Sequence, residues 1–195
     1  MTRGGGLSDF SRKIGSAPSP GQDHAQICRA HTAADGTGSF AIYSACETYR
    51  YRLDRRWSDA PPLTWIMLNP STATEAANDP TIARCEARAR AGAYGGLRIV
   101  NLFALRATRP ADLKRHPSPH GPANDGHLLD ACAGAACVVA GWGVHGVHLD
   151  RGADVRRLLR DSGVAIHTLG LTQHGQPRHP LYVAYATQPE PWPHD

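Results

Sequence analysis

Long hydrophobic runs are absent from this chain of 195 residues. No apolar stretch approaches the ~20 residues that a membrane-spanning helix requires. The Gly/Ser/Pro-rich segment from Met1 to Gly21 also lacks the apolar core of a secretion signal. The sequence therefore predicts a cytoplasmic protein with no membrane partner.

Paired cysteines are absent as well. The five cysteines are odd in number and form no Cys-x-x-Cys pair, so we expect reduced thiols, several of which fill the core. The eleven histidines are scattered along the chain. His145 and His148 could share one face of a helix, but no third ligand follows at a motif spacing. We therefore expect no metal site and no cofactor.

A large excess of one charge is also missing. The formal net charge is +4, with 19% charged and 41% hydrophobic residues, as in a soluble globular protein. Arginine is far commoner than lysine, a balance that is compatible with a nucleic-acid partner but does not require one. The length suffices for one domain with a full core, which we expect to be a monomer.

The most informative segment that is present runs from Trp65 to Thr81. Trp65 to Leu68 is a short apolar run, typical of a strand that is buried on both faces. Pro70 cannot donate to a sheet ladder and therefore ends the run. Asp79 and Pro80 have the pattern of a helix N-cap and first-turn pair. The pattern predicts a strand, a polar loop and a helix N-terminus, which in an open α/β sheet is where ligands bind.

Similar apolar runs alternate with helical patterns through the rest of the chain. We predict a single α/β domain over residues 39–186, with three α/β/α layers around a central, mostly parallel four-stranded sheet and an N-terminal β-hairpin. Residues 1–38 are expected to be a disordered tail, and residues 187–195 a Pro-rich C-terminal tail. The expected hairpin covers 40–53, the strands 65–68, 97–102, 137–142 and 164–169, the helices 79–91, 122–133 and a third from about 150, and an edge strand 181–185, whereas 107–124 is expected to be mostly loop.

Three polar segments follow predicted strand ends, and in a parallel sheet these ends share one edge. They are residues 69–72, 101–106 and 174–179. Asn101, a lone amide at the end of an apolar strand, could bond to backbone or reach into a ligand pocket. We expect Asn69, Asn101 and His179 to line one cleft.

For several other residues the sequence allows either a structural role or a role in the ligand site. Asp79 is either a helix cap or a site carboxylate. Ser71 and Thr72 could donate to a phosphate or close a turn. His179 and Arg178 could stabilise an oxyanion or bind phosphate, or His179 could serve only the loop. The arginines in and just after the expected hairpin form a solvated face or a phosphate site: Arg50, Arg52, Arg55 and Arg56.

Three segments resemble a bacterial family, domain of unknown function 1643. They are Ile66-Met-Leu-Asn-Pro-Ser-Thr-Ala73 with Asn78-Asp-Pro-Thr81, Tyr94-Gly-Gly-Leu-Arg-Ile-Val-Asn-Leu-Phe-Ala-Leu-Arg106, and Gly175-Gln-Pro-Arg-His-Pro-Leu-Tyr182. The resemblance covers about residues 42–182 and implies membership, but no established activity.

The order of motifs also resembles the uracil-DNA glycosylase superfamily. Leu68-Asn69-Pro70 is similar to its first motif, in which an asparagine positions the attacking water. Val100-Asn-Leu-Phe is similar to the strand whose asparagine reads the pyrimidine edge, here Asn101. Val138-Val-Ala-Gly-Trp-Gly143 is similar to its apolar strand that ends in Trp-Gly. His179-Pro180 stands at the position of the second motif, which implies that His179 holds the leaving base.

The sequence departs from that superfamily at several positions. Ser71 replaces the glycine after Asn-Pro, and Leu181-Tyr182 replaces the Ser-Pro of the second motif, so no DNA-intercalating segment is recognisable. No aromatic platform follows Asn69-Pro70. The segment from His116 to Pro119 matches the second motif in sequence but precedes the third strand, and we interpret it as a loop coincidence.

The function that this resemblance implies is hydrolysis of an N-glycosidic bond of a base in nucleic acid or in a nucleotide. Because a neutral asparagine is a poor base, Asn69 implies a slow enzyme or a good leaving group. The alternative is a non-catalytic nucleotide-binding or nucleic-acid-binding module with the same pocket. The candidate catalytic residues are Asn69, His179 and Asp79, and the candidate substrate-binding residues are Pro70, Ser71, Thr72, Asn101, Arg106, His174 and Arg178.

Overall fold

Two apolar strands form the centre of the sheet in the computed structural model, which describes residues 25–193. Strand β4 (Leu63–Met67) is buried along its whole length, and β5 (Gly96–Asn101) runs parallel beside it. The register pairs Met67 with Asn101, so the chain leaves both strands at the same edge. Backbone bonds from Leu102 N to Met67 O (2.9 Å) and from Phe103 N to Leu68 O (3.0 Å) continue this pairing beyond the strands.

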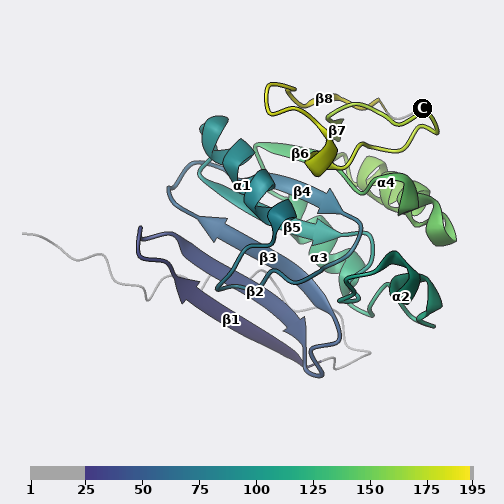
Figure 1. Cartoon of the computed structure of the whole chain (residues 1–195), viewed down its shortest axis with the longest axis horizontal. Helices are drawn as coiled ribbons and strands as arrows, with labels where there is room; N and C mark the ends of the chain where they lie inside the picture. The colour runs from purple at the N-terminus through teal and green to yellow at the C-terminus, as the bar shows by residue number, and fades with distance from the viewer. Residues whose placement is uncertain (1–24, 194–195) are drawn as a thin grey trace, which may run out of the picture.

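The sheet has eight strands in the order β1-β2-β3-β5-β4-β6-β7-β8 (Figure 1). It is mixed rather than the four-stranded sheet that we expected. The four strands indicated by the apolar runs, β5, β4, β6 and β7, lie side by side within it and run parallel. The hairpin β2-β3 adds antiparallel strands next to β5. The remaining bounds are β1 (Gln26–Thr32), β2 (Gly38–Ser44), β3 (Arg50–Arg56), β6 (Cys137–Ala140), β7 (His167–Thr168) and β8 (Glu190–Pro191).

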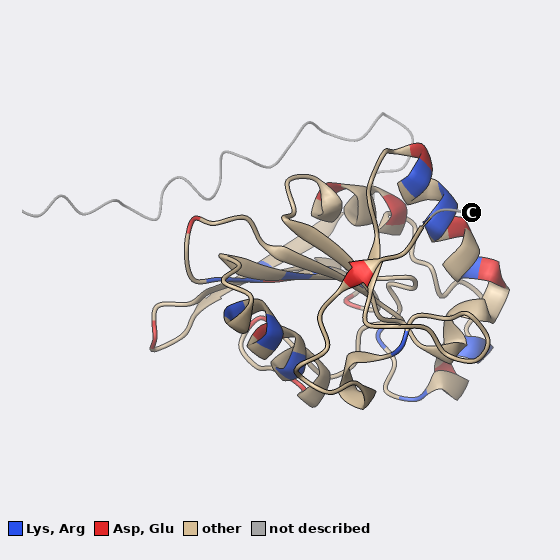
Figure 2. Ribbon diagram, turned by 90° about the horizontal axis from the view of Figure 1, so that it is seen from above, with Lys and Arg blue, Asp and Glu red and all other residues tan. Residues whose placement is uncertain are grey.

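Helices cover both faces of the parallel part of the sheet, as the alternation of strands and helices predicts for an α/β protein (Figures 1 and 2). Helix α1 (Pro80–Ala91) packs on the face that carries Trp65 and Ile99. The opposite face, with Ile66 and Val100, contacts three helices. They are α2 (Pro110–Arg115), α3 (Asn124–Cys132) and α4 (Arg151–Asp161).

Helix α1 forms where the sequence predicts it. Asp79 is its N-cap, with Oδ1 accepting a hydrogen bond from Ile82 N at 2.9 Å, and Pro80 occupies the first turn. Ile82, Cys85 and Ala89 are buried, which confirms the apolar side expected from their spacing. The cap brings the Asp79 carboxylate to the edge of the sheet at which β4 and β5 end.

Other parts of the chain differ from the expectation. Residues 181–185 do not form an edge strand, because Pro180–Tyr182 makes a 3-10 turn (η3); the last strand is β8 instead. The stretch expected to be mostly loop holds α2. The sheet begins with β1, before the expected domain start at residue 39, and β8 lies in the expected C-terminal tail. The part of the expected N-terminal tail before residue 25 lies outside the described residues.

Candidate functional site

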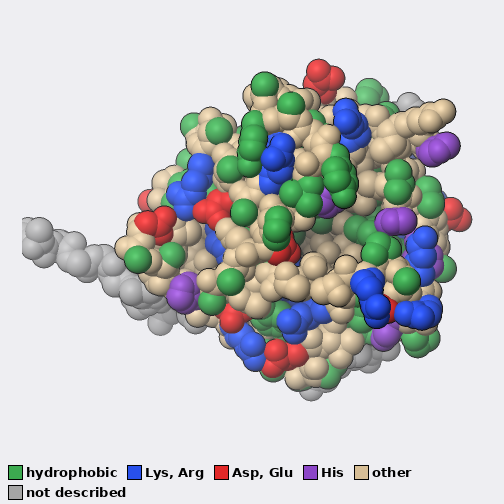
Figure 3. Space-filling model, in the orientation of Figure 1, with side chains coloured by type: hydrophobic (Ala, Val, Ile, Leu, Met, Phe, Trp, Pro, Cys, Tyr) green, Lys and Arg blue, Asp and Glu red, His purple; other side chains and the backbone are tan. Residues whose placement is uncertain are grey.

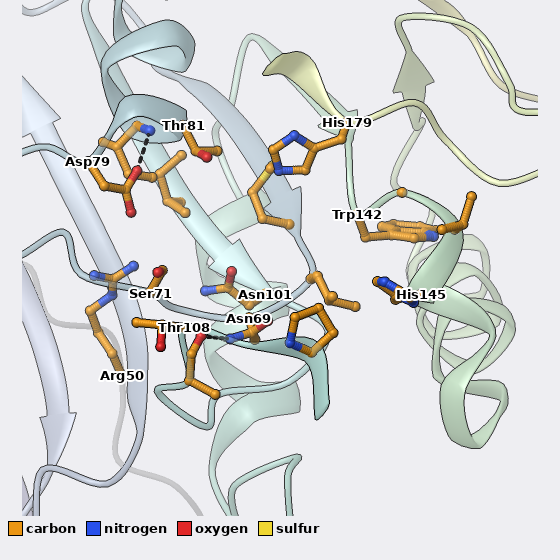
Figure 4. Close-up of a pocket in the computed structure, with 18 of the residues that line it drawn as sticks. Arg50, Asn69, Ser71, Asp79, Thr81, Asn101, Thr108, Trp142, His145 and His179 are labelled. Atoms are coloured by element: carbon orange, nitrogen blue, oxygen red, sulfur yellow. Dashed lines mark hydrogen bonds between the residues drawn. The ribbon is translucent and has the colours of Figure 1, made fainter. Parts of the chain in front are cut away.

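A cavity of about 450 Å³ lies beyond the carboxyl ends of β4, β5 and β6. This size is within the ~300–1,000 Å³ that is typical of small-ligand sites. The connection after β4 crosses one face of the sheet to β5, whereas the connection after β6 crosses the other face to β7. Ligands of open α/β sheets bind at such a switch point. The molecule is hollowed near the centre of the face shown in Figure 3, and Figure 4 shows the lining side chains.

Asn69 is held by its own loop and the loop after β5. Its Nδ2 donates to Ala107 O at 2.6 Å and to Pro70 O at 2.9 Å, and Ala107 N in turn donates to Pro70 O at 2.9 Å. Because the amide nitrogen is fixed, the amide orientation is fixed as well. No donor among residues 25–193 bonds to Asn69 Oδ1, so this oxygen is available to a ligand or a water in the cavity.

Asn101 lies at the base of the cavity and is only 2% exposed. Its Nδ2 is buried and has no hydrogen-bond partner among the described residues. A buried amide N–H without a partner is rare, because it loses its bonds to water and gains nothing in return. The cavity therefore holds a donor that a ligand acceptor would satisfy. Figure 4 shows this side chain between Asn69 and His179.

Asp79 lines the cavity but is already engaged. Oδ1 accepts from Ile82 N, and Oδ2 accepts from Ala73 N at 3.4 Å. These bonds confirm that Asp79 caps helix α1. The carboxylate still faces the same space as Ser71 and Thr81, whose hydroxyls add donors near the N-terminus of α1.

His179 reaches the cavity from the long loop after β7. Arg84 of α1 secures this loop by donating to Pro180 O at 2.8 Å and to Val183 O at 2.7 Å. Burial lowers the pKa of His179, whereas the Asp79 carboxylate acts in the opposite direction. His179 Nδ1 accepts from Leu181 N at 3.4 Å, which assigns the proton of the neutral ring to Nε2. Nε2 is then a donor.

Arg50 of β3 forms the end of the cavity near Asp79 (Figure 4). Its side chain is 2% exposed, so the solvated-face interpretation is wrong for this residue. Nη1 donates to Ala73 O, whereas Nε is buried and has no hydrogen-bond partner within residues 25–193. Burial lowers the pKa of Arg50 to about 10, so the guanidinium stays charged at neutral pH.

The opposite end of the cavity is aromatic. Trp142, 2% exposed, follows β6 and donates from Nε1 to Gln176 Oε1 at 3.0 Å. His145 stands beside it, and burial lowers the pKa of this histidine. Tyr182 lines the rim and is 77% exposed. A flat, apolar group can therefore lie at this end, with polar groups toward Asn101.

Five of the ten predicted site residues line this cavity: Asn69, Ser71, Asp79, Asn101 and His179. Thr72 and Arg106 line a neighbouring depression with Glu47 and Asp112. His174 and Arg178 are exposed and outside both, and Arg178 donates to Tyr182 O at 3.2 Å. Pro70 is buried and contributes through its carbonyl oxygen.

The sequence reasoning missed several lining residues. Trp142 and His145 carried a signal, because they follow the third apolar strand and therefore share the edge at which β4 and β5 end. Thr81 in the first turn of α1 could have been found by the same logic. Arg50 was named only as one of four arginines that could bind phosphate, and Thr108 was not named, since their positions in the cavity depend on how the loops fold over the sheet.

Neither metal ligands nor membrane helices are apparent in the described part of the chain. Within residues 25–193, no three His, Cys, Asp or Glu residues are grouped so that they could hold a metal ion. Over the same range, no helix has the length and apolar character needed to cross a membrane.

The fold and the cavity define an α/β protein with a ligand site at the carboxyl edge of its parallel strands. The model of a family described as "Protein of unknown function (DUF1643)" matches residues 50–181, and the chain belongs to this family. The matched range contains β3 to β7 and all the lining residues except Tyr182. No curated protein and no solved structure is significantly similar to the chain.

Proposed function

We propose that the protein hydrolyses the N-glycosidic bond of a nucleobase held in this cavity. The observation that carries the proposal is the pairing of two differently oriented amides. Asn69 turns a fixed acceptor toward the cavity, whereas Asn101 presents an unpartnered donor at its base. A fixed acceptor can orient a water molecule, and a buried donor can read a carbonyl on a base edge.

The remaining lining groups supply what this reaction requires. When the glycosidic bond breaks, its electron pair stays with the base, the water oxygen bonds to the sugar carbon, and the proton that the water loses ends, through solvent, on the released base. His179 Nε2 can donate a hydrogen bond to the departing anionic base. Trp142 and His145 offer a surface on which the planar base can pack.

The resemblance to the uracil-DNA glycosylase superfamily supports the same roles. Asn69 follows the first parallel strand and Asn101 ends the second, the positions at which that superfamily has its water-positioning and base-reading asparagines. His179 lies in the loop after the last parallel strand, at the position of the second motif. We assign these residues by their place in the fold as well as by their motifs.

A second candidate is a binding module that recognises the base without cleaving it. The engagement of Asp79 favours this candidate, because both of its oxygens accept backbone hydrogen bonds. No other carboxylate lines the cavity among the described residues, so no strong base stands beside the proposed water. The hydrolytic proposal therefore requires a good leaving group or slow turnover.

One paired assay separates the two candidates. Oligonucleotides and nucleotides that carry different normal and damaged bases are tested for base release and for binding. Hydrolysis predicts that Asn69→Ala lowers turnover strongly with little loss of affinity, because the oriented water matters in the transition state. Binding without base release by the wild-type protein on every substrate would leave only the module.

A further inference from the structure

Arg50 is a buried cation with no direct ion pair, and the Asp79 carboxylate acts on it only at longer range. It forms no ion pair with any described residue, and its Nε has no partner. Two other arginines are buried among the described residues: Arg151 pairs with Asp125, whereas Arg55 donates to Thr74 O and to Asn78 Oδ1. The partly buried Arg52 pairs with Asp54. A charge removed from water normally needs a partner of opposite sign. An anion in the adjacent cavity would supply it.

The surroundings of Arg50 supply further donors for an anion. Ser71 and Thr81 bring hydroxyls to the same end of the cavity. The N-terminus of the twelve-residue helix α1 adds the positive end of its dipole. Arg106 and Arg55 contribute further positive charge near Arg50. Asp79 opposes an anion, but its oxygens already accept two backbone bonds.

Among residues 25–193, the arginines nearest the cavity mouth outside it are engaged by acidic or backbone partners. Arg109 and Arg115 both pair with Asp112, and Arg106 donates to Glu47 O at 3.1 Å. A polynucleotide is normally held by cations spread along its backbone. A buried guanidinium at one end of a cavity suits the terminal phosphate of a small ligand instead, because an internal phosphodiester continues on both sides.

From these observations we infer that the ligand is a mononucleotide, with its phosphate monoester at Arg50 and its base between Asn101 and Trp142. This inference rests on the proposed function for the base and adds the phosphate. Arg50 binds and orients the ligand without taking part in bond cleavage.

The test compares nucleosides with their 5′-monophosphates, for each common base, by isothermal titration calorimetry. In the wild-type protein the monophosphate should bind about 10- to 100-fold more tightly than its nucleoside, as for a charge-assisted hydrogen-bonded pair. In Arg50→Met this ratio should fall to near 1. The matched control is Arg52→Met, on the same strand and outside the cavity, which should keep the wild-type ratio.

Thermal unfolding gives a second readout that also checks the folding of the variant. Millimolar inorganic phosphate should raise the Tm of the wild-type protein and of Arg52→Met, but not that of Arg50→Met. An equal rise in Arg50→Met, or a nucleoside that binds as tightly as its monophosphate, would overturn the inference. Tighter binding of an oligonucleotide than of any mononucleotide would overturn it as well.

The outcomes separate this inference from the proposed hydrolysis. If the phosphate preference is present but no base is released, the mononucleotide site stands and hydrolysis is wrong. If base is released from an oligonucleotide while the phosphate preference is missing, hydrolysis stands and the mononucleotide site is wrong.

Discussion

Replacing Asn101 with leucine should make the protein more stable and abolish base recognition. The side chain is 2% exposed, and its Nδ2 is buried without a partner. An unsatisfied buried donor costs ~1–3 kcal/mol. Leucine has the same number and branching of side-chain heavy atoms as asparagine, no polar atoms, and a bulk that can extend into the adjoining cavity. We expect Asn101→Leu to raise the free energy of unfolding by ~1–2 kcal/mol, which corresponds to a Tm increase of about 2–8 °C for a chain of this size.

Asn124 provides the matched control. It is equally buried, but its Nδ2 donates to Asn101 O at 2.9 Å and to Leu102 O at 3.0 Å. Asn124→Leu removes both bonds together with the buried, unpartnered Oδ1 of Asn124, while Leu102 O keeps its bond from Arg151 Nε. The loss of two bonds should outweigh the relief at Oδ1 and lower the free energy of unfolding by ~1–2 kcal/mol. Urea denaturation of both variants measures the two changes. A similar destabilisation in both variants would refute the reasoning, because it would mean that the Asn101 amide is satisfied in the ligand-free protein.

Three further predictions concern the site and its scaffold. Asn69→Ala should lower base release by roughly 100-fold or more with an affinity within about threefold of wild type, as measured by single-turnover kinetics and calorimetry. Burial holds the pKa of His179 below its ordinary value, so the folded state takes up this proton less readily than the unfolded chain. Stability should therefore fall as pH drops below ~6.5, and His179→Gln should show a shallower fall in denaturation curves from pH 8 to 5. Gly126 lies in α3, where a new Cβ would meet open space, so Gly126→Ala should stabilise the protein by ~0.5–1 kcal/mol in thermal unfolding. Gly95→Ala would place a Cβ 2.0 Å from Ala60 O, so it should destabilise the protein by ~3 kcal/mol or more.

The sequence predicted those elements of the fold whose buried side chains form a regular pattern of apolar residues. The apolar run of β4 and the spacing of Ile82, Cys85 and Ala89 in α1 are direct consequences of packing on both faces of the sheet. Strand β1 left no such pattern, because six of its seven residues are exposed and it is held by backbone pairing to β2. Strand β7 is only two residues long but lies within the strand expected over residues 164–169, whereas β8, also two residues long, was not predicted.

The site residues also divide into those that the sequence could place and those that it could not. Asn69, Asn101 and Asp79 could be placed because each adjoins a predicted strand end or helix start, and the topology brings these points together. Arg50 could not, because an arginine between Tyr49 and Tyr51 on a polar strand has the pattern of a solvated residue. Its burial comes from the loop through Ala73, whose carbonyl accepts from Nη1. Only the folded loop shows which of the hairpin arginines faces the cavity.

The most direct test of the proposed base recognition is the side-chain amide signal of Asn101 in ¹⁵N NMR during titration with a bound nucleotide. The chain has four asparagines, so selective labelling gives a simple spectrum in which Asn78 and Asn124 are internal controls. Nδ2 of Asn124 is already bonded to backbone, and that of Asn78 to Glu86. Our account predicts that the Asn101 amide shifts and exchanges more slowly with solvent as the ligand saturates, while the signals of the two controls stay in place. Saturation with no change at Asn101 would contradict it.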